Sequence, residues 1–289
     1  LNARSLGFAL GPRMNAAGRL ETAAYAQDML LAREGERALE LAQQLDTMNA
    51  SRRSEQDEIF KMARAQALQY EHDPVLVLSH PEWNHGIIGI VAAKILEKYQ
   101  KPTYVLQELG DESKGSARSY GDFSAADAIR ASDDIITKGG GHKLAAGVTL
   151  PTANINAFRE RVNEYFRSLE LRPQPPLLLP NADVTIKGFS EVNEALVDQL
   201  AKLEPYGNGN PEAILRCDTV LVKHMRRMGA DAQHVKLAVR DRQGYEIELL
   251  AFSAPEAWFV EPGQTVHVWF SPMINEWRGR RTVEGRLVR

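Results

Sequence analysis

The residues best suited to chemistry lie in the segment 137–147, where three consecutive glycines precede His142. Consecutive glycines permit positive φ angles, so backbone N–H groups can converge on one point. Such a concave set of donors suits a phosphate or a carboxylate. His142 adds a side chain that can donate to an oxyanion or transfer a proton. The segment therefore predicts an anion site that includes Gly140, Gly141 and His142. A tight glycine turn with a capping histidine is the alternative.

A second anion contact is predicted in the segment 115–119, which reads Gly-Ser-Ala-Arg-Ser. Ser116 and Arg118 are two residues apart, so on a strand their side chains project from the same face. A hydroxyl and a guanidinium side by side can share the oxygens of one phosphate. The alternative is an ordinary exposed strand pair.

Three further polar side chains, Arg13, Asn15 and Arg19, stand among small and apolar neighbours in residues 6–20. Planar groups with several donors suit the fixed recognition of phosphate. Glycine and proline punctuate this segment densely, so we expect an ordered loop that leads into a helix. In the alternative interpretation the arginines only brace loop carbonyls.

The sequence offers no set of residues that would perform catalysis or hold a metal. His80 and His85 are five positions apart across a proline, which matches no zinc spacing. Neither a Ser-His-Asp order nor a carboxylate pair stands out, and no Asp/His cluster could hold two metals. The single cysteine, Cys217, excludes an internal disulfide and a thiolate zinc site. We therefore expect a site that binds substrate and no metal ligands in this chain.

Length and composition are those of an ordinary soluble globular protein of two or three domains. The chain has 289 residues, of which 44% are hydrophobic and 25% charged, with a net charge of −3. No apolar run approaches the roughly 18 residues that span a bilayer, so no membrane association is expected. The N-terminus has neither Met nor a signal sequence, which predicts a piece of a longer protein. The cysteine content favours the cytoplasm.

The elements expected to position these residues begin with one long helix, 36–70, which contains neither Gly nor Pro. Its middle, 49–58, reads as polar on every face, which is typical of a bridge between domains. Alternating strands and helices then predict a small α/β domain. The predicted strands are 75–78, 103–106 and 114–119, and the predicted helices are 86–99, a capped start at Ser124, and 155–169.

A proline-rich linker at 172–176 precedes a predicted helix, 191–203, and five strand-like runs. The runs are 213–222, 233–240, 245–252, 264–271 and 280–288. Five short strands in this space predict a small β-barrel, most simply an OB-fold. Its basic and aromatic residues are candidate DNA contacts, with a solvated strand face as the alternative. The candidates are Arg226, Arg227, Trp277, Arg278, Arg280 and Arg281.

Five motifs occur in one order along nearly the whole chain. They are LGPRMNAAGRL (10–20), HPEWNHGIIGIVAAKI (80–95), GSARS (115–119), GGGHKLAAG (139–147) and LEPYGNGNP (203–211). In this order the chain resembles the RecJ family, single-stranded-DNA-specific 5′→3′ exonucleases of the DHH phosphoesterase superfamily. The resemblance implies five parts: 1–35, the end of the DHH catalytic domain; 36–73, a connecting helix; 74–172, the DHH-associated domain; 173–180, a linker; and 181–289, an OB-fold.

The same resemblance implies a role in degrading single-stranded DNA during recombination and repair. In the family, aspartate and DHH ligands hold two divalent ions, Mn²⁺ or Mg²⁺, and this sequence lacks that catalytic domain. Arg13, Asn15 and Arg19 would face the metal centre. Ser116, Arg118 and the segment around His142 would hold the DNA backbone or its 5′ end. Single-stranded DNA is the expected partner, with a single-stranded-DNA-binding protein and a helicase as further candidates.

Two other functions stay open from the sequence. One is a DHH-type phosphodiesterase of short oligonucleotides or cyclic dinucleotides, against which the OB-fold and residues 203–211 argue. The other is a noncatalytic nucleic-acid-binding or partner-docking module. On its own, this chain is expected to be inactive as a nuclease.

Overall fold

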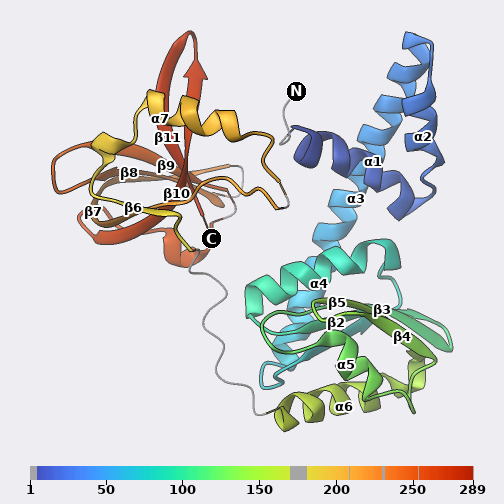
Figure 1. Cartoon of the computed structure of the whole chain (residues 1–289). Helices are drawn as coiled ribbons and strands as arrows, with labels where there is room; N and C mark the ends of the chain where they lie inside the picture. Colours follow the sequence, from blue (N-terminus) through green and yellow to red (C-terminus); the bar gives the residue numbers. More distant parts are fainter. Residues whose placement is uncertain (1–4, 170–180, 208, 230–231, 253, 289) are drawn as a thin grey trace. The chain divides into compact units, whose positions relative to one another are not determined.

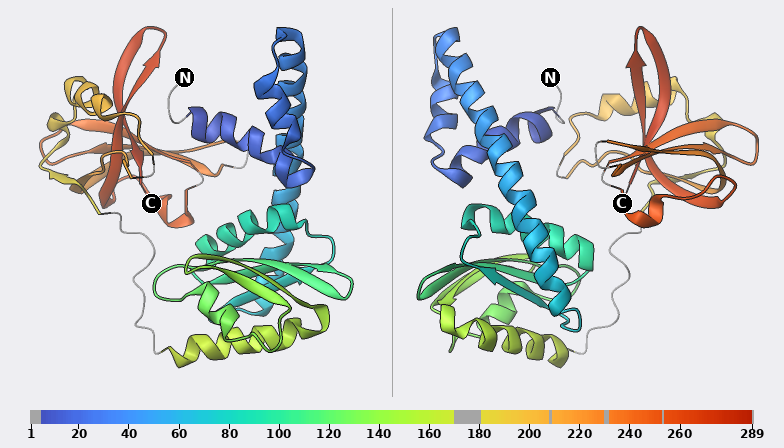
Figure 2. Two further views of the ribbon diagram at one scale, coloured as in Figure 1. Left: turned by 45° about the vertical axis from the view of Figure 1, so that its right-hand side comes forward. Right: turned by 180° about the vertical axis from the view of Figure 1, so that it is seen from behind.

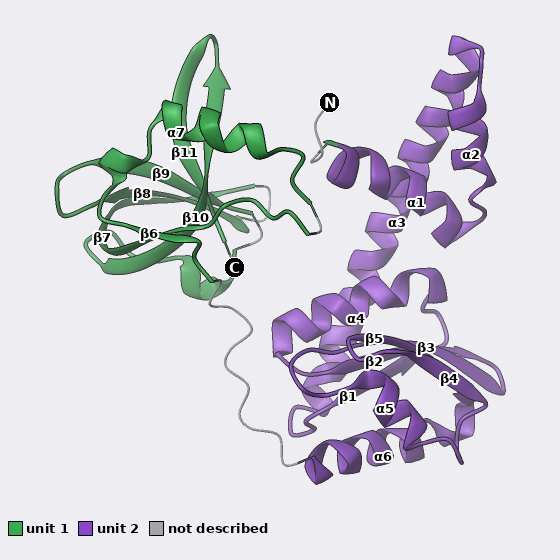
Figure 3. Ribbon diagram, in the orientation of Figure 1, with its two compact units in different colours: residues 1–5, 178–289 green, residues 6–177 purple. Residues whose placement is uncertain are grey.

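The computed structural model describes residues 5–169, 181–207, 209–229, 232–252 and 254–288. The chain divides into two compact units, Leu6–Leu177 and Leu178–Arg289 with Leu1–Ser5 (Figures 1 and 3). The predicted linker, 173–180, lies outside the described residues. Among the described residues, no helix is long and apolar enough to cross a membrane.

The first unit begins with helices, where the sequence predicted a loop. A π-helical segment, Ser5–Leu10, precedes α1 (Gly11–Leu20), and α2 (Ala24–Leu31) follows. The loop prediction for residues 6–20 was therefore wrong. Pro12 is tolerated at the start of α1, where no helical N–H is lost. Ala16 and Ala17 are fully buried in a cluster with Leu45 and Met48, and this packing outweighs the poor helix propensity of glycine.

The long helix is present as α3 (Gly35–Gln69), roughly 50 Å in length at 1.5 Å per residue. The interpretation of its middle, 49–58, as a bridge that is polar on every face missed that one of these faces is buried. Asn49, Arg52 and Gln56 are buried. At spacings of three and four residues, they continue the buried stripe of the helix. The other buried members are Leu41, Leu45, Met48, Ile59, Ala63 and Ala67.

A mixed five-stranded sheet with the order β1-β2-β3-β5-β4 follows. Its strands are β1 (Leu76–His80), β2 (Thr103–Leu109), β3 (Glu112–Arg118), β4 (Lys138–His142) and β5 (Ala145–Pro151). Only β1 and β2 pair in parallel. Helices α3 and α4 (His85–Tyr99) cover one face, and α5 (Ala125–Arg130) and α6 (Ile155–Ser168) cover the other (Figure 2). The predicted α/β class is confirmed.

The glycine segment is the edge strand β4, and the predicted nest or tight turn is not formed. Two of the glycines are required by space. A Cβ on Gly139 would lie 2.4 Å from Ile129 Cγ2, and one on Gly141 would lie 2.6 Å from the Ala145 carbonyl oxygen. Gly141 also has a φ of +142°. Gly140 faces open space, because a Cβ there would meet nothing within 4 Å.

The second unit is a six-stranded sheet with the order β10-β11-β9-β8-β7-β6, closed by pairing of β10 with β7. The five predicted strands are present, and β7 and β10 are longer than predicted. The strands are β6 (Val184–Ile186), β7 (Leu215–Met228), β8 (His234–Arg240), β9 (Glu246–Ala251), β10 (Thr265–Trp277) and β11 (Arg280–Leu287). The predicted helix is represented by α7 (Glu194–Leu200) and a short 3₁₀ turn. The core contains Phe189, Leu215, Val239 and Phe270.

Candidate nucleic-acid interface

Ser116 and Arg118 lie side by side on β3, beneath the second turn of α4. A Cβ on Gly89 of α4 would lie 3.1 Å from Arg118 Nη2 and 3.4 Å from Ser116 Oγ. The missing side chain of Gly89 therefore makes room for both groups. Arg118 Nη1 donates to the carbonyl oxygen of Ala117 at 2.7 Å. The two residues share one face of the strand, as their spacing predicted.

The strand register connects this pair with the glycine segment. Arg118 pairs with Ala145, which pairs with His142. One row further along, Ser116 pairs with Gly147, and Gly147 pairs with Gly140. Directly paired residues project from the same face of a sheet, and neighbouring strands are about 4.8 Å apart. The Cα atoms of Arg118 and His142 are thus separated by roughly 10 Å, with only small residues between them.

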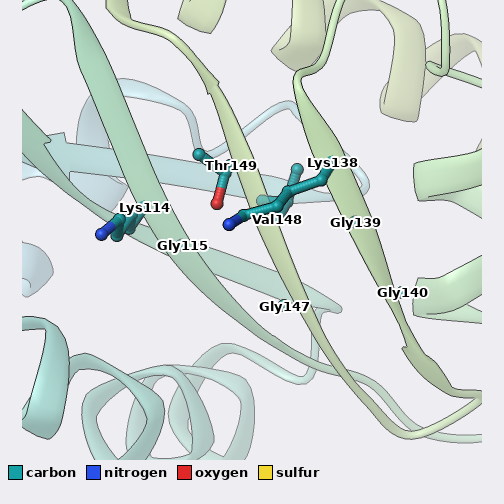
Figure 4. A pocket seen from close by; sticks show the side chains of 8 residues that line it. All are labelled: Lys114, Gly115, Lys138, Gly139, Gly140, Gly147, Val148 and Thr149. Carbon is teal, nitrogen blue, oxygen red and sulfur yellow. The ribbon is translucent and has the colours of Figure 1, made fainter.

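A shallow pocket of about 360 Å³ continues the same face along β3, β5 and β4 (Figure 4). Beside the two rows of paired residues described above lies a third row, in which Lys114 pairs with Thr149 and Thr149 pairs with Lys138. In the view of Figure 4 the Lys138 side chain runs toward Thr149 and Lys114. Neither lysine has an ion-pair partner in the part of the chain that the structure describes. The pocket is lined by Lys114, Gly115, Lys138, Gly139, Gly140, Gly147, Val148 and Thr149.

The sequence interpretation missed these two lysines. The signal was available, because Lys114 stands two residues before Ser116 and Lys138 two residues before Gly140. On strands, that spacing keeps side chains on one face. It was not used because the glycine segment was interpreted as a turn.

The three polar residues of α1 separate into two groups. Arg13 donates from Nε to Asp46 Oδ1 at 2.8 Å and from Nη1 to the carbonyl oxygen of Ala9 at 2.8 Å. Its charge is therefore balanced within the fold, as in the bracing interpretation. Asn15 and Arg19 are exposed and four residues apart, so they share a different side of the helix.

Arg19 connects α1 to the site on β3. Its Nη1 donates to the carbonyl oxygen of Gly86 at 3.0 Å, in the first turn of α4. Its own carbonyl oxygen packs so tightly that a Cβ on Gly86 would lie 2.1 Å from it. Burial lowers the pKa of the Arg118 guanidinium, and the nearby charge of Arg19 lowers it further. The two like charges repel each other, so an anion bound between or beside them would be stabilised by both.

In the second unit, two of the six candidate DNA contacts are neutralised internally. Arg227 donates to Glu256 at 3.0 Å and stacks on the Phe259 ring at 3.8 Å. Arg281 donates to Asp198 at 2.9 Å and also pairs with Glu194 on α7. These contacts anchor the two arginines within the unit.

The other four candidates remain available. Trp277 is 70% exposed at the end of β10, directly paired with Arg280 on β11. Arg278 lies 5.9 Å from the Trp277 ring at the turn of this hairpin. Arg226 is exposed on β7 and contacts only Met228 Sδ, at 3.6 Å, among the described residues. Trp277, Arg278 and Arg280 thus combine an exposed ring with two cations that have no carboxylate partner within the described ranges.

No group of three His, Cys, Asp or Glu side chains that could hold a metal ion occurs among the described residues. Trp83 is only 1% exposed and belongs to the core, where it stacks on His80 at 5.7 Å. Cys217 is buried, and burial raises its pKa to about 11, so the thiol stays protonated at neutral pH.

Comparisons with known proteins agree with this architecture. Two family models match, the DHHA1 domain over residues 72–168 and the RecJ OB domain over residues 183–288. The single-stranded-DNA-specific exonuclease RecJ of Escherichia coli is 30% identical over 98% of this chain and 50% of its own length. RecJ of Bacillus subtilis is 29% identical over 97% of this chain and 36% of its own length.

A solved structure covers the whole chain. The crystal structure of RecJ in complex with Mn²⁺ from Thermus thermophilus matches with a TM-score of 0.84 and 30% identity. The match covers 100% of this chain and 41% of the Thermus protein. The chain thus spans half or less of the length of these relatives. With the DHHA1 and RecJ OB domains in the same order and the same fold, the chain belongs to the RecJ family.

Proposed function

We propose that this chain is the strand-binding part of an exonuclease that degrades single-stranded DNA from its 5′ end. The observation that carries the proposal is one sheet face of the first unit, where Ser116 and Arg118 beneath α4 stand in two neighbouring rows with the exposed Gly140 and His142. Helix α4 packs over β2 and β3, and every residue of β4 is exposed. An extended nucleic-acid backbone can therefore lie along β5 and β4.

Each side chain of this face has a distinct task in the proposal. Arg118 offers a planar pair of donors to one phosphate, and Ser116 adds a hydroxyl donor. His142 donates to the same or the next phosphate from the opposite side of the row. Gly140 and Gly147 have no side chains, so the backbone of the strand can approach the sheet closely.

In this proposal, the residues that hold the catalytic metal ions are not among the described residues. Relatives have been crystallised with Mn²⁺ and with Mg²⁺. When bound, two such ions activate a water and stabilise the leaving oxygen in phosphodiester cleavage. The acidic and histidine residues described here do not fit them. The chain contributes binding and orientation, and Arg13, Asn15 and Arg19 are proposed to face the metal-holding part.

The second unit favours a polymeric substrate over a cyclic dinucleotide. An exposed Trp277 beside Arg278 and Arg280 suits base stacking combined with phosphate contacts, which is how OB-folds hold single strands. A cyclic dinucleotide would not need such a surface. A noncatalytic binding module would have the same surfaces. Nuclease activity of the longer protein therefore separates the proposed exonuclease from a noncatalytic module.

The proposal is tested by measuring binding and degradation with the 289-residue chain. We expect binding of a fluorescent single-stranded oligonucleotide that weakens as salt increases, because phosphate contacts release counterions. We expect no degradation in the presence of Mn²⁺. An affinity independent of salt would contradict the phosphate contacts. Degradation that His142→Ala abolishes would contradict the assignment of the chain to binding alone.

Loss of Lys114 and Lys138 is expected to weaken binding of single-stranded DNA. The double variant Lys114→Ala/Lys138→Ala should lower the affinity about tenfold at low salt and reduce the slope of log K against log salt by about 1.4. The reason is that two phosphate contacts at the end of the pocket are lost. Fluorescence anisotropy across a salt series measures both quantities.

The matched control is Lys61→Ala/Lys98→Ala, which removes two exposed lysines from α3 and α4. This variant carries the same change in net charge and should keep the slope. If both double variants lose the same affinity, the effect reflects net charge, and the pocket does not contact the strand.

A further inference from the structure

Three helices meet beside the Ser116–Arg118 pair, and a buried arginine lies at their junction. Helices α1, α3 and α4 contact one another. Leu45 and Met48 of α3 pack with α1, while Ile59 and Ala63 of α3 pack with α4. Leu20, next to Arg19, contacts both clusters. Arg52 lies between these two groups on the same buried stripe of α3.

The Arg52 side chain is held in place by two amides, with no carboxylate partner among the described residues. It is 9% exposed. Its Nη1 donates to Gln56 Oε1 at 2.7 Å, and its Nη2 donates to Asn49 Oδ1 at 3.0 Å. Its Nε is buried and has no hydrogen-bond partner in the same described ranges. Two neutral amides therefore fix the guanidinium and leave its charge unbalanced.

The charges around Arg52 make its position unfavourable in the absence of an anion. Burial lowers the pKa of the Arg52 guanidinium, and the like charges of Arg53 and Arg19 lower it further. Asp57 acts in the opposite direction but is already paired with Lys94 at 3.0 Å. A buried charge without a counterion is costly, and apolar replacements of such groups are often neutral or stabilising. Stability of the fold alone therefore gives no reason for an arginine here.

Arg19 is the common neighbour of the buried Arg52 and the half-buried Arg118. It is close enough to lower the pKa of Arg52 on α3 and of Arg118 on β3. Its hydrogen bond to Gly86 fixes it at the start of α4, whose Gly89 covers Arg118. Arg19 thus links the α1–α3–α4 junction, where Arg52 is buried, to the start of α4 and through Gly89 to Arg118.

We propose that Arg52 supplies a fixed buried charge to a phosphate site that Arg19 and Arg118 form at this junction. The inference deepens the proposed function, on which it rests, because the bound group is a phosphate of the single strand. Arg52 acts through its field and does not touch the phosphate. A charge held rigidly in a low-dielectric position acts strongly on a nearby anion, because no solvent has to reorganise.

The test compares Arg52→Met with Arg53→Met in the 289-residue chain. Methionine has a similar length and helix propensity but no charge. Arg53 is the exposed next residue and serves as the control with the same change in net charge. We expect Arg52→Met to keep or raise Tm, and to weaken binding of single-stranded DNA roughly three- to thirtyfold. Arg53→Met should change the affinity less than about twofold.

A second measurement needs no DNA and separates this inference from the proposed function. Inorganic phosphate should raise the Tm of the wild type and of Arg53→Met, and raise that of Arg52→Met and Arg118→Ala distinctly less. If this pattern appears but no variant or wild type binds DNA, the arginine site is supported and the proposed function fails.

An Arg52→Met variant with a lowered Tm but unchanged affinities for DNA and phosphate would show that Arg52 only braces α3, and would overturn the inference. If Arg52→Met does not fold, Arg52→Lys replaces it. That variant keeps the charge but loses the amide contacts, so it should retain phosphate-dependent stabilisation. Loss of this stabilisation in a folded Arg52→Lys variant would also count against the proposal.

Discussion

Replacing Arg118 by alanine is expected to lower kcat/KM of the proposed exonuclease by roughly one to three orders of magnitude. The side chain lies half-buried on β3 beneath Gly89, and its only hydrogen bond within the described residues is to a backbone carbonyl. Its donors are therefore available to a phosphate. Lysine at this position should restore activity only partly, because it lacks the planar fork.

The control for this variant is Arg161→Ala. Arg161 lies on α6, on the other side of the sheet, and pairs with Asp134 at 2.8 Å. Its removal should leave kcat/KM within about twofold of the wild type. Substrates that end in a 5′-phosphate or a 5′-hydroxyl then show which phosphate Arg118 holds. A defect that shrinks on the hydroxyl substrate indicates recognition of the 5′ end. Normal kinetics, or weakened Mn²⁺ binding as the main defect, would show that Arg118 does not bind the strand.

The part of the site that depends on strand period was predictable from the sequence. Ser116 and Arg118 are separated by two residues within a segment of strand-forming pattern, and the structure places both on one face. The fold class was predictable for the same reason, since the order of periodic segments specifies the layers. The resemblance to RecJ, carried by the five motifs, agrees with the family found by comparison.

The glycine segment was misinterpreted because its structure is determined by its neighbours. Glycine has a low strand propensity, so local reasoning favours a turn. In the fold, β5 supplies a pairing partner for residues 138–142, and Ile129 leaves no room for a side chain at Gly139. The polar middle of α3 was misjudged in a similar way. Asn49, Arg52 and Gln56 are buried because α1 and α4 pack on either side of them, which no local pattern records.

Replacing Gly141 by alanine is expected to destabilise the first unit by roughly 2 to 4 kcal/mol. Two independent causes act at this position. Its φ of +142° is unfavourable for any residue with a Cβ. An added Cβ would also lie 2.6 Å from both the Ala145 carbonyl oxygen and the Ala146 Cα, which are backbone atoms and cannot move aside without shifting β5. Chemical denaturation followed by circular dichroism measures this loss.

The neighbouring variant Gly140→Ala separates the needs of the fold from those of the ligand. An added Cβ at Gly140 meets nothing within 4 Å, so the free energy of unfolding should change by less than about 0.5 kcal/mol. The methyl group would project onto the open face beside Ser116 and Gly147, where we propose that the strand lies. Binding of single-stranded DNA should therefore weaken roughly fivefold, or about 1 kcal/mol.

Unchanged affinity with unchanged stability would mean that the strand does not pass over Gly140. A large loss of stability would mean that its surroundings are more crowded than the structure indicates. Gly141→Ala is expected to lose stability and Gly140→Ala to lose affinity for DNA. The two variants together therefore test the path of the DNA strand without changing any charge.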